Sequence, residues 1–387
     1  MAPLPRLNRG PTLALLCAVY FGAGLSLASI GPNLSALAAN VDRDVALIGS
    51  QFTAFSLGTV VVQFVVGPFS DRYGQRTVLS LGLLMMGLGI LGESLSRELT
   101  LLLVFAGLGG LGFGSILSSG SVLVPRLFPV RGTSALNLVN LFFGVGSIVG
   151  PLVAGRALAQ LGSPLPALWL GAGLLLGLFP LALLAAEADV PAEGALNGSV
   201  PWLLVLLLGC LLLVYSGTEI ALGGWAALYL EIGADMAPAQ AAIAVAGFWF
   251  ALTVGRGAGA LLGLRFSALQ VLLMTIILLL SGSVLLFFMV GNPTGSIGAL
   301  LVLGLAFGPI FPTTMALVAL TSGGRGTAAA VALAIGNSGG AIIPPLMGLV
   351  LSRAGPPAVA LLVVISTSIV FLLACAVVVV SRRAQQL

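Results

Sequence analysis

Long apolar segments follow one another along the whole chain, and they limit its fold more than any other feature. A helix needs roughly 20 mainly apolar residues to cross a bilayer. Division of the chain at its charged residues and its Asn-Pro and Gly-Pro pairs leaves twelve such segments, and 59% of the 387 residues are hydrophobic against 7% charged. The sequence therefore predicts an all-α integral membrane protein with twelve transmembrane helices. The expected segments are 11–38, 45–69, 76–95, 99–125, 131–159, 165–186, 200–230, 238–263, 267–290, 295–320, 326–352 and 357–381.

Charge and metal-binding residues exclude several classes of function. The fifteen cationic residues are all arginines, and they are spread over short loops, so we expect no nucleic-acid partner. The chain has no histidine, and Cys17, Cys210 and Cys375 fall in separate apolar segments, so we expect no metal and no cofactor. An integral-membrane enzyme is a weak alternative because the chain lacks a plausible nucleophile with its base.

The arginines also predict an orientation. Twelve helices place both termini on one side, and if that side is the cytoplasm, ten arginines lie inside and four outside. We expect a multi-pass protein of the bacterial inner (plasma) membrane with both termini cytoplasmic. The apolar stretch that follows Arg9 runs to about Leu37 without a convincing cleavage site, so we interpret it as the first spanning helix.

A polar stretch and an internal repeat divide the chain. Residues 187–199 carry three acidic side chains and predict a cytoplasmic linker between an N-terminal six-helix bundle, 1–186, and a C-terminal one, 200–387. At an offset of 194, Arg131-Gly-Thr falls on Arg325-Gly-Thr, and Gly114, Gly146 and Pro151 fall on Gly308, Gly340 and Pro345. We therefore expect two pseudo-symmetric bundles with a binding site near mid-membrane between them.

Glu219 is the first functional candidate, because it interrupts the apolar run that begins near Val200. A carboxyl near the bilayer centre costs at least about 2.5–3.5 kcal/mol, so it is retained where it faces a cavity, a partner or a ligand. Tyr215 and Thr218 share its helix face. Arg256 is its expected partner. The sequence leaves open whether Glu219 is an ionised structural pair with Arg256 or a carboxyl that carries a coupling proton.

Amide and aromatic side chains complete the candidate substrate site. Amides can donate to and accept from sugar hydroxyls, and aromatic rings can stack on the apolar face of a pyranose. Each amide could equally be a hydrogen-bonding contact between helices. Trp225 reaches the face of Glu219 only if Gly223-Gly224 breaks the helix. The expected substrate-binding residues are Tyr20, Asn137, Asn140, Tyr215, Glu219, Trp225, Trp249 and Asn337, and Gln51 and Gln63 are weaker amide candidates.

The segment Gly67-Pro-Phe-Ser-Asp71-Arg72-Tyr-Gly74-Gln-Arg76 is the expected loop after the second helix. Asp71 can cap a helix start or pair with an arginine, and Gly74 permits a tight turn. The segment resembles the Gly-x-x-x-Asp-Arg-x-Gly-Arg-Arg signature of the major facilitator superfamily. That resemblance implies the major facilitator fold and a conformational latch between the two halves, formed by Gly67, Asp71, Arg72, Gly74 and Arg76. Gln75 replaces the usual arginine, so we expect a weakened latch.

A narrower resemblance covers five helices. The segments 136–151, 215–230, 248–256, 308–313 and 336–345 resemble helices of the fucose, galactose and glucose permease family of sugar:proton symporters. The resemblance implies a cavity for a monosaccharide. Helices one and four lack the carboxylate that proton-coupled members tend to carry. Glu219 must therefore relay any coupling proton, and a sodium symporter or a facilitator remains open.

Our sequence-based prediction is a secondary active transporter that works by alternating access as a monomer, with cation-coupled uptake of a hexose-like solute driven by protons or sodium. Gly146-Ser-Ile-Val-Gly150-Pro151-Leu-Val-Ala154-Gly155 also resembles the fifth-helix motif of drug and proton antiporters. Efflux of drugs or other amphipathic compounds is therefore the first alternative, and an uncoupled facilitator is the second.

Overall fold

A computed structural model describes residues 7–187, 200–323 and 325–384 of the chain. Its contacts divide the chain into two compact units, Met1–Glu193 and Gly194–Leu387. The predicted linker, apart from Glu187, lies outside the described residues. All regular secondary structure in the described ranges is helical.

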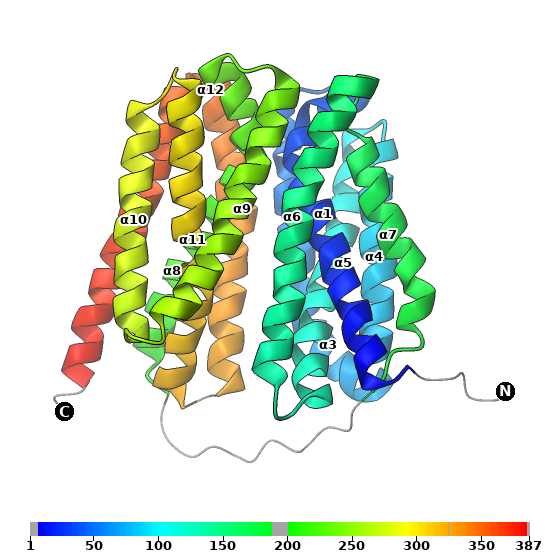
Figure 1. The fold of residues 1–387 in the computed structure, drawn as a ribbon, viewed down its shortest axis with the longest axis vertical. Helices are drawn as coiled ribbons and strands as arrows, with labels where there is room; N and C mark the ends of the chain where they lie inside the picture. The colour runs from blue at the N-terminus through cyan, green and yellow to red at the C-terminus, as the bar shows by residue number, and fades with distance from the viewer. Residues whose placement is uncertain (1–6, 188–199, 324, 385–387) are drawn as a thin grey trace. The chain divides into compact units, whose positions relative to one another are not determined.

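The first unit contains seven of these helices (Figure 1). They are α1 (Arg9–Asn40), α2 (Val45–Ile48), α3 (Ser50–Tyr73), α4 (Gln75–Leu95), α5 (Leu99–Leu127), α6 (Gly132–Leu161) and α7 (Pro166–Ala182). Asp44 begins α2 by accepting a hydrogen bond from the backbone N–H of Ala46 at 2.7 Å. The short α2 runs almost directly into α3, so the two together form the predicted second span.

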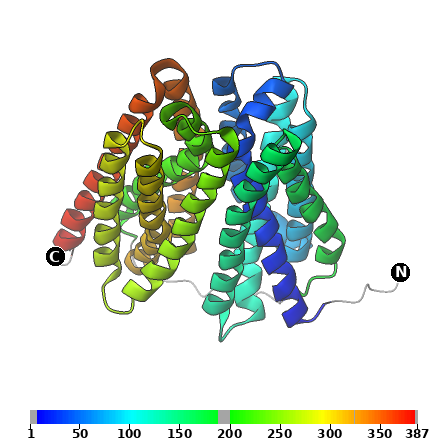
Figure 2. The same cartoon turned by 45° about the horizontal axis from the view of Figure 1, so that its top comes forward.

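The second unit contains the remaining five described helices. They are α8 (Trp202–Ala234), α9 (Pro238–Leu262), α10 (Ala268–Phe288), α11 (Pro293–Ser322) and α12 (Gly326–Ala384). Helix α12 is interrupted by Gly355, whose φ of 75° is not helical, and the chain turns back there as the orange and red segment of Figure 2 shows. It therefore contains both of the last two predicted spans.

Ten helices in the described part of the chain are long and apolar enough to cross a membrane. Helix α7 is a shorter apolar helix, and α12 supplies two spans, so the helices match the twelve predicted segments one for one. One boundary is wrong. The residues from Gly67 to Tyr73, expected as a loop, form the last turns of α3, and Gly74 alone separates α3 from α4. Its φ of 83° is accessible to glycine, so a single residue suffices for the turn.

Glycines bring the helices of the first unit into close contact. A Cβ atom on Gly110 of α5 would collide with the carbonyl of Phe55 on α3, and one on Gly146 of α6 would collide with the carbonyl of Phe21 on α1. Helices in lipid gain little from hydrophobic burial against each other, and small residues let their backbones approach. These contacts hold α3 against α5 and α1 against α6, which also run side by side in Figure 1.

The second unit repeats the arrangement. Helix α9 packs on α11, and α8 packs on α12, as α3 packs on α5 and α1 on α6 in the first unit. Gly114 of α5 meets the backbone of Thr59 on α3, and Gly308 of α11, its repeat partner, meets the backbone of Leu252 and Arg256 on α9. The sequence repeat therefore corresponds to a repeated helix contact. Each unit is a bundle built on the same plan.

Candidate substrate and coupling site

The candidate site in the C-terminal unit is centred on the hydroxyl of Tyr215, on α8. Glu219 follows one turn later, so both side chains leave the same face of the helix. The Tyr215 hydroxyl lies within hydrogen-bond distance of Glu219 Oε2, and it lies 3.1 Å from the backbone oxygen of Phe307 on α11. The two predicted residues therefore meet each other and a third that the sequence did not single out.

A tyrosine hydroxyl has one proton, and both of its neighbours here are potential acceptors. If Glu219 is ionised, Tyr215 can donate to only one of them at a time. If Glu219 is protonated, its O–H donates to the Tyr215 oxygen while Tyr215 donates to the Phe307 carbonyl. Both hydrogen bonds are then made at once. The geometry is thus fully satisfied when Glu219 holds a proton.

Arg256, on α9, lies within electrostatic range of the Glu219 carboxyl and the Tyr215 hydroxyl. Gly308 lets the backbone of α11 approach that of α9 at Arg256, where the backbone nitrogen lies 2.5 Å from the position of a Cβ atom. Arg256 is half-buried. The expected ion pair between Arg256 and Glu219 is absent from the ion pairs of the described residues, so the guanidinium can favour an ionised Glu219 only through a longer-range attraction.

A chain of aromatic rings extends from Tyr215 to Trp249. The ring centroids of Tyr215 and Phe307 are 5.6 Å apart, those of Phe307 and Phe248 are 6.2 Å apart, and those of Phe248 and Trp249 are 5.4 Å apart. Such spacings fall in the range of favourable tilted and edge-on ring contacts. The chain connects α8, α11 and α9, and fixes the faces that these helices present.

Trp249 carries an unused hydrogen-bond donor. Its side chain is 6% exposed, and its indole nitrogen has no hydrogen-bond partner among the described residues. The ring packs on Gly223 of α8, where a Cβ atom would lie 2.6 Å from a ring carbon. Gly223 follows Glu219 by one turn, so the Trp249 ring packs on α8 one turn beyond Glu219. An unpaired buried N–H is costly, and a ligand that accepts a hydrogen bond removes that cost.

Trp225 does not reach the face of Glu219, because the helix break that this would require is absent. Helix α8 is continuous through Gly223 and Gly224, so these glycines do not break it. The side chain is 1% exposed, and its indole nitrogen donates to the backbone oxygen of Pro344 on α12 at 2.8 Å. Trp225 therefore packs α8 against α12, away from the face of Glu219.

The remaining predicted site residues lie in different places. Tyr20 of α1 is 2% exposed and lies against Gly120 of α5. On α6, Asn137 is exposed, whereas Asn140 is half-buried and donates to the backbone oxygen of Leu136 at 2.9 Å. Asn337 is half-buried on α12, in the C-terminal unit. In the described part of the chain, none of these four side chains forms a hydrogen bond with the Tyr215 hydroxyl.

The residues of the predicted latch surround the junction of α3 and α4. Gly67, Asp71 and Arg72 are exposed on the last turns of α3, and the Arg72 guanidinium lies 5.2 Å from the centre of the Tyr73 ring. Arg76 follows Gly74 on the first turn of α4, and it pairs with Glu187, with 3.8 Å between Nη2 and Oε2.

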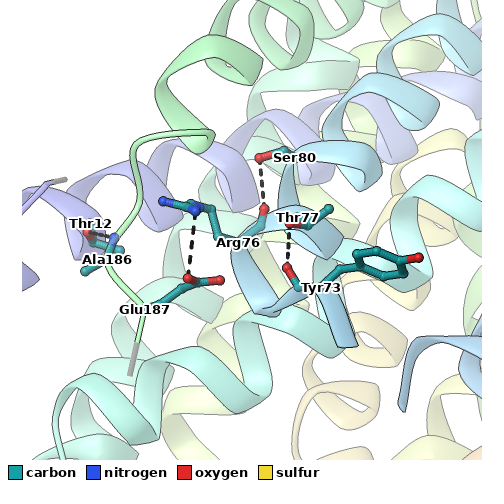
Figure 3. A network of polar contacts seen from close by, with 7 residues as sticks. All are labelled: Thr12, Tyr73, Arg76, Thr77, Ser80, Ala186 and Glu187. Atoms are coloured by element: carbon teal, nitrogen blue, oxygen red, sulfur yellow. Dashed lines mark hydrogen bonds and ion pairs between the residues drawn. The ribbon is translucent and has the colours of Figure 1, made fainter. Parts of the chain in front are cut away.

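Figure 3 shows the surroundings of this pair. The backbone N–H of Ala186 donates to the Thr12 hydroxyl at 3.0 Å, and Ser80 donates to the Arg76 carbonyl at 2.8 Å. The Glu187 carboxylate also lies against Gly74, where a Cβ atom would collide with it. The described contacts of Arg76 thus tie the segment after α7 to the start of α4 within the first unit.

The sequence did not single out three residues that the structure brings forward. Phe248 and Phe307 connect Tyr215 to Trp249. Phe248 begins the segment 248–256 quoted for the permease resemblance, and Phe307 directly precedes the segment 308–313. Glu93 is a second buried carboxyl, 1% exposed, on α4. Its place inside the predicted span 76–95 was the signal that the sequence offered.

These features define a polytopic membrane protein with a buried polar site in a duplicated helical bundle. Residues 16–233 match the family model described as Major Facilitator Superfamily, which is more than half of the chain. The chain belongs to the Major Facilitator Superfamily, a family of transporters and not of enzymes.

Curated relatives include transporters with different printed substrates. The human sodium-dependent glucose transporter 1 is 26% identical over 149 residues, which are 38% of this chain and 29% of the relative. The 4-hydroxybenzoate transporter PcaK of Pseudomonas aeruginosa is 31% identical over 174 residues, 44% of this chain and 37% of the relative. The multidrug resistance protein MdtM of Escherichia coli is 28% identical over 139 residues, 36% of this chain and 34% of the relative. The match thus spans about a third of each of these relatives.

Solved structures show the same fold along almost the whole chain. A mutant of the nucleoside transporter NupG superposes with a TM-score of 0.77 at 15% identity, over 96% of this chain and 99% of that one. A bacterial homologue of the human lysosomal transporter Spinster gives a TM-score of 0.73 at 14% identity, over 97% of each chain. The predicted major facilitator fold, with twelve spans, is confirmed.

Proposed function

We propose that this protein moves a monosaccharide across the membrane by alternating access, and that uptake is coupled to protons through Glu219. The observation that carries the proposal is the arrangement around Tyr215, whose hydroxyl faces both Glu219 and the Phe307 carbonyl. A half-buried carboxyl that is satisfied when protonated, and that has an arginine within electrostatic range when ionised, can serve as a reversible proton site.

Trp249 supports a polar ligand with an apolar face. Its indole N–H has no partner among the described residues, and its ring belongs to a row of aromatic side chains. A sugar supplies hydroxyl oxygens to accept from the indole and C–H faces to lie against rings. Asn137, Asn140 and Asn337 are further candidates for its hydroxyls. The similarity to a sodium-dependent glucose transporter favours the same substrate class.

The coupling step moves one proton. When the site meets the side of higher proton concentration, the Glu219 carboxylate accepts a proton from water and becomes a carboxylic acid. On the other side the acid releases that proton to water, and Arg256 stabilises the carboxylate that results. If sodium replaced the proton, or if transport were uncoupled, the protonation of Glu219 would have no role in transport.

We further propose the organisation that this mechanism needs. Bundles 1–186 and 200–387 move relative to each other about the linker 187–199, and the segment Gly67, Asp71, Arg72, Gly74 and Arg76 restrains them. The arginine distribution supports an inner-membrane protein with cytoplasmic termini. Relatives with inner-membrane roles, such as the inner membrane transport protein YdiN of Escherichia coli, agree with that placement. We propose a monomer as the working unit.

Efflux of amphipathic compounds is the alternative that a specific observation favours. A groove of about 590 Å³ runs between α1 and α6 and is lined by small and apolar residues that include Phe21, Leu138 and Phe142. Such a surface suits a lipophilic compound better than a sugar. The similarity to MdtM points the same way.

A binding screen separates the two functions. Purified full-length protein in detergent is titrated by calorimetry with D-glucose, D-galactose and L-fucose, and in parallel with the lipophilic cation tetraphenylphosphonium. L-glucose serves as the control for stereospecific recognition. The proposal expects saturable binding of at least one of the three sugars and none of L-glucose or the cation. Binding of tetraphenylphosphonium with no sugar binding would establish the efflux alternative.

A further inference from the structure

Glu93 of α4 is a carboxyl sealed inside the N-terminal unit. Its residue is 1% exposed, and neither carboxyl oxygen has a hydrogen-bond partner among the described residues. Neutral carboxylic acids tolerate such a site far better than carboxylates, because a buried ion without a partner loses its hydration and gains nothing in return.

The nearest surroundings of the carboxyl are apolar. The position of a Cβ atom on Gly109 of α5 lies 3.7 Å from Glu93 Oε1 and 3.6 Å from a ring carbon of Phe55 on α3. The Phe55 ring packs in turn on Phe113, with 5.6 Å between centroids. Gly109 thus makes room for the carboxyl between α4 and α5, with a phenylalanine as its next neighbour.

The charged groups of the packed helices lie elsewhere. Helices α3 and α5 run antiparallel to α4, and their charged residues are at the ends opposite Glu93. Helix α7 has no titratable residue in its span. On α1, Arg9 is at the far end, and Cys17 and Tyr20 are the other titratable groups. The titratable groups on the five helices are Arg9, Cys17 and Tyr20 of α1, Asp71, Arg72 and Tyr73 of α3, Arg76 of α4 and Arg126 of α5.

The charged residues nearest to Glu93 in sequence, Arg97 and Glu98, do not pair with it either. Arg97 follows α4, but its Nη1 donates to Asn40 Oδ1 at 3.1 Å. Glu98 precedes α5 and carries the same charge as an ionised Glu93. Asp42, Arg43 and Asp44, in the turn between α1 and α2, are exposed, and the described residues show no ion pair to Glu93.

We propose that Glu93 is a proton-binding site of the N-terminal unit, separate from Glu219 in the C-terminal unit. A carboxylate that takes one proton from water becomes a neutral acid, and this form suits the space between α4 and α5. A metal cation is a poor alternative, because it needs several oxygen ligands. The buried amide of Gln51, which precedes Phe55 by one turn and has no partner for either polar atom, offers one oxygen.

Infrared spectroscopy of the purified full-length protein tests the proposal, whichever solute the protein carries. At pH 7 a solvent-exposed glutamate, with an ordinary pKa of about 4.3, is ionised and gives no carboxylic acid C=O band. We expect wild type to show such a band with a component that is lost in Glu93→Gln and retained in Glu219→Gln. The component should exchange slowly when H₂O is replaced by D₂O, because water must enter between α4 and α5. Identical spectra for wild type and Glu93→Gln would overturn the proposal.

Thermal unfolding at increasing pH gives a second measurement that does not depend on the infrared assignment. The unfolded chain releases the Glu93 proton above the ordinary glutamate pKa of about 4.3, whereas the folded site keeps it, so wild type should lose stability as the pH rises above that value. Glu93→Gln and the apolar Glu93→Met lack that group, and their profiles should be flatter. Profiles as steep as that of wild type would contradict a buried acid at this position. If neither variant folds, a Glu219→Gln protein without a carboxylic acid band would overturn the proposal equally.

Discussion

Replacement of Tyr215 by phenylalanine removes one hydroxyl and leaves the packing of the ring against Phe307 in place. The hydroxyl lies 3.1 Å from the Phe307 carbonyl and within hydrogen-bond distance of Glu219 Oε2. The Phe307 carbonyl belongs to α11, so it keeps its own helical hydrogen bond. Glu219 bears most of the loss.

The expected loss of stability follows from the polar groups that no longer have the Tyr215 hydroxyl as a partner. A buried polar group that loses its partner costs about 1–3 kcal/mol. For Tyr215→Phe we expect the free energy of unfolding to fall by about 2 kcal/mol, since one group loses its partner fully and the other only in part. That change is roughly a 30-fold shift in the unfolding equilibrium, at about 1.4 kcal/mol for each factor of ten.

Equilibrium unfolding in mixed detergent and SDS micelles, followed by circular dichroism, measures this difference. Tyr229→Phe is the matched control, because Tyr229 is on the same helix and is 2% exposed, and Ser296, which interacts with its hydroxyl, keeps its own hydrogen bond to the Met289 carbonyl at 2.9 Å. The control should change stability by less than about 0.5 kcal/mol. Equal effects of the two variants would refute the assignment of the Tyr215 hydroxyl as the centre of the site.

The remaining predictions concern Trp249 and the turn between α3 and α4. Trp249→Phe should weaken binding of the recognised sugar about tenfold, as calorimetry would show, because one hydrogen bond of about 1.4 kcal/mol is lost; unchanged affinity would remove Trp249 from the site. Gly74→Ala should destabilise the protein by about 1–2 kcal/mol, since a residue with a Cβ is strained at positive φ. The control Gly67→Ala, where a Cβ meets open space, should not be destabilising, and the reverse order of the two unfolding free energies would contradict this account. Arg76→Gln should cost about 0.2–1 kcal/mol in low salt and less in high salt, because its pair with Glu187 is partly exposed; a loss that salt does not reduce would argue against an ion pair.

The fold could be predicted almost completely from the sequence. Lipid requires long apolar helices, so their number and approximate positions follow from hydropathy alone. The repeat that pairs Gly114 with Gly308 is visible in the sequence, because each glycine keeps a backbone contact that a side chain would prevent. The end of α3 could not be located, because a single glycine at Gly74 replaces the longer loop that the polar residues before it suggested.

The candidate site could be predicted only in part. The pairing of Tyr215 with Glu219 follows from their spacing on one helix. The role of the Phe307 carbonyl depends on how α11 packs on α8, which no local pattern in the sequence contains. Trp225 was assigned to the site on condition of a helix break that α8 does not have. Glu93 lies near the end of its span, where a charged residue usually reaches water, so only its position in the packed unit shows that it is buried.

The central claim, that Glu219 carries the proton that couples uptake, is tested most directly in proteoliposomes with a pH-sensitive dye in the lumen. Addition of D-glucose outside should acidify the lumen with wild-type protein, because each sugar enters with a proton. Glu219→Gln should abolish the acidification while exchange of labelled for unlabelled glucose continues, since exchange needs no net proton movement. Acidification of equal rate and extent with Glu219→Gln would contradict the account.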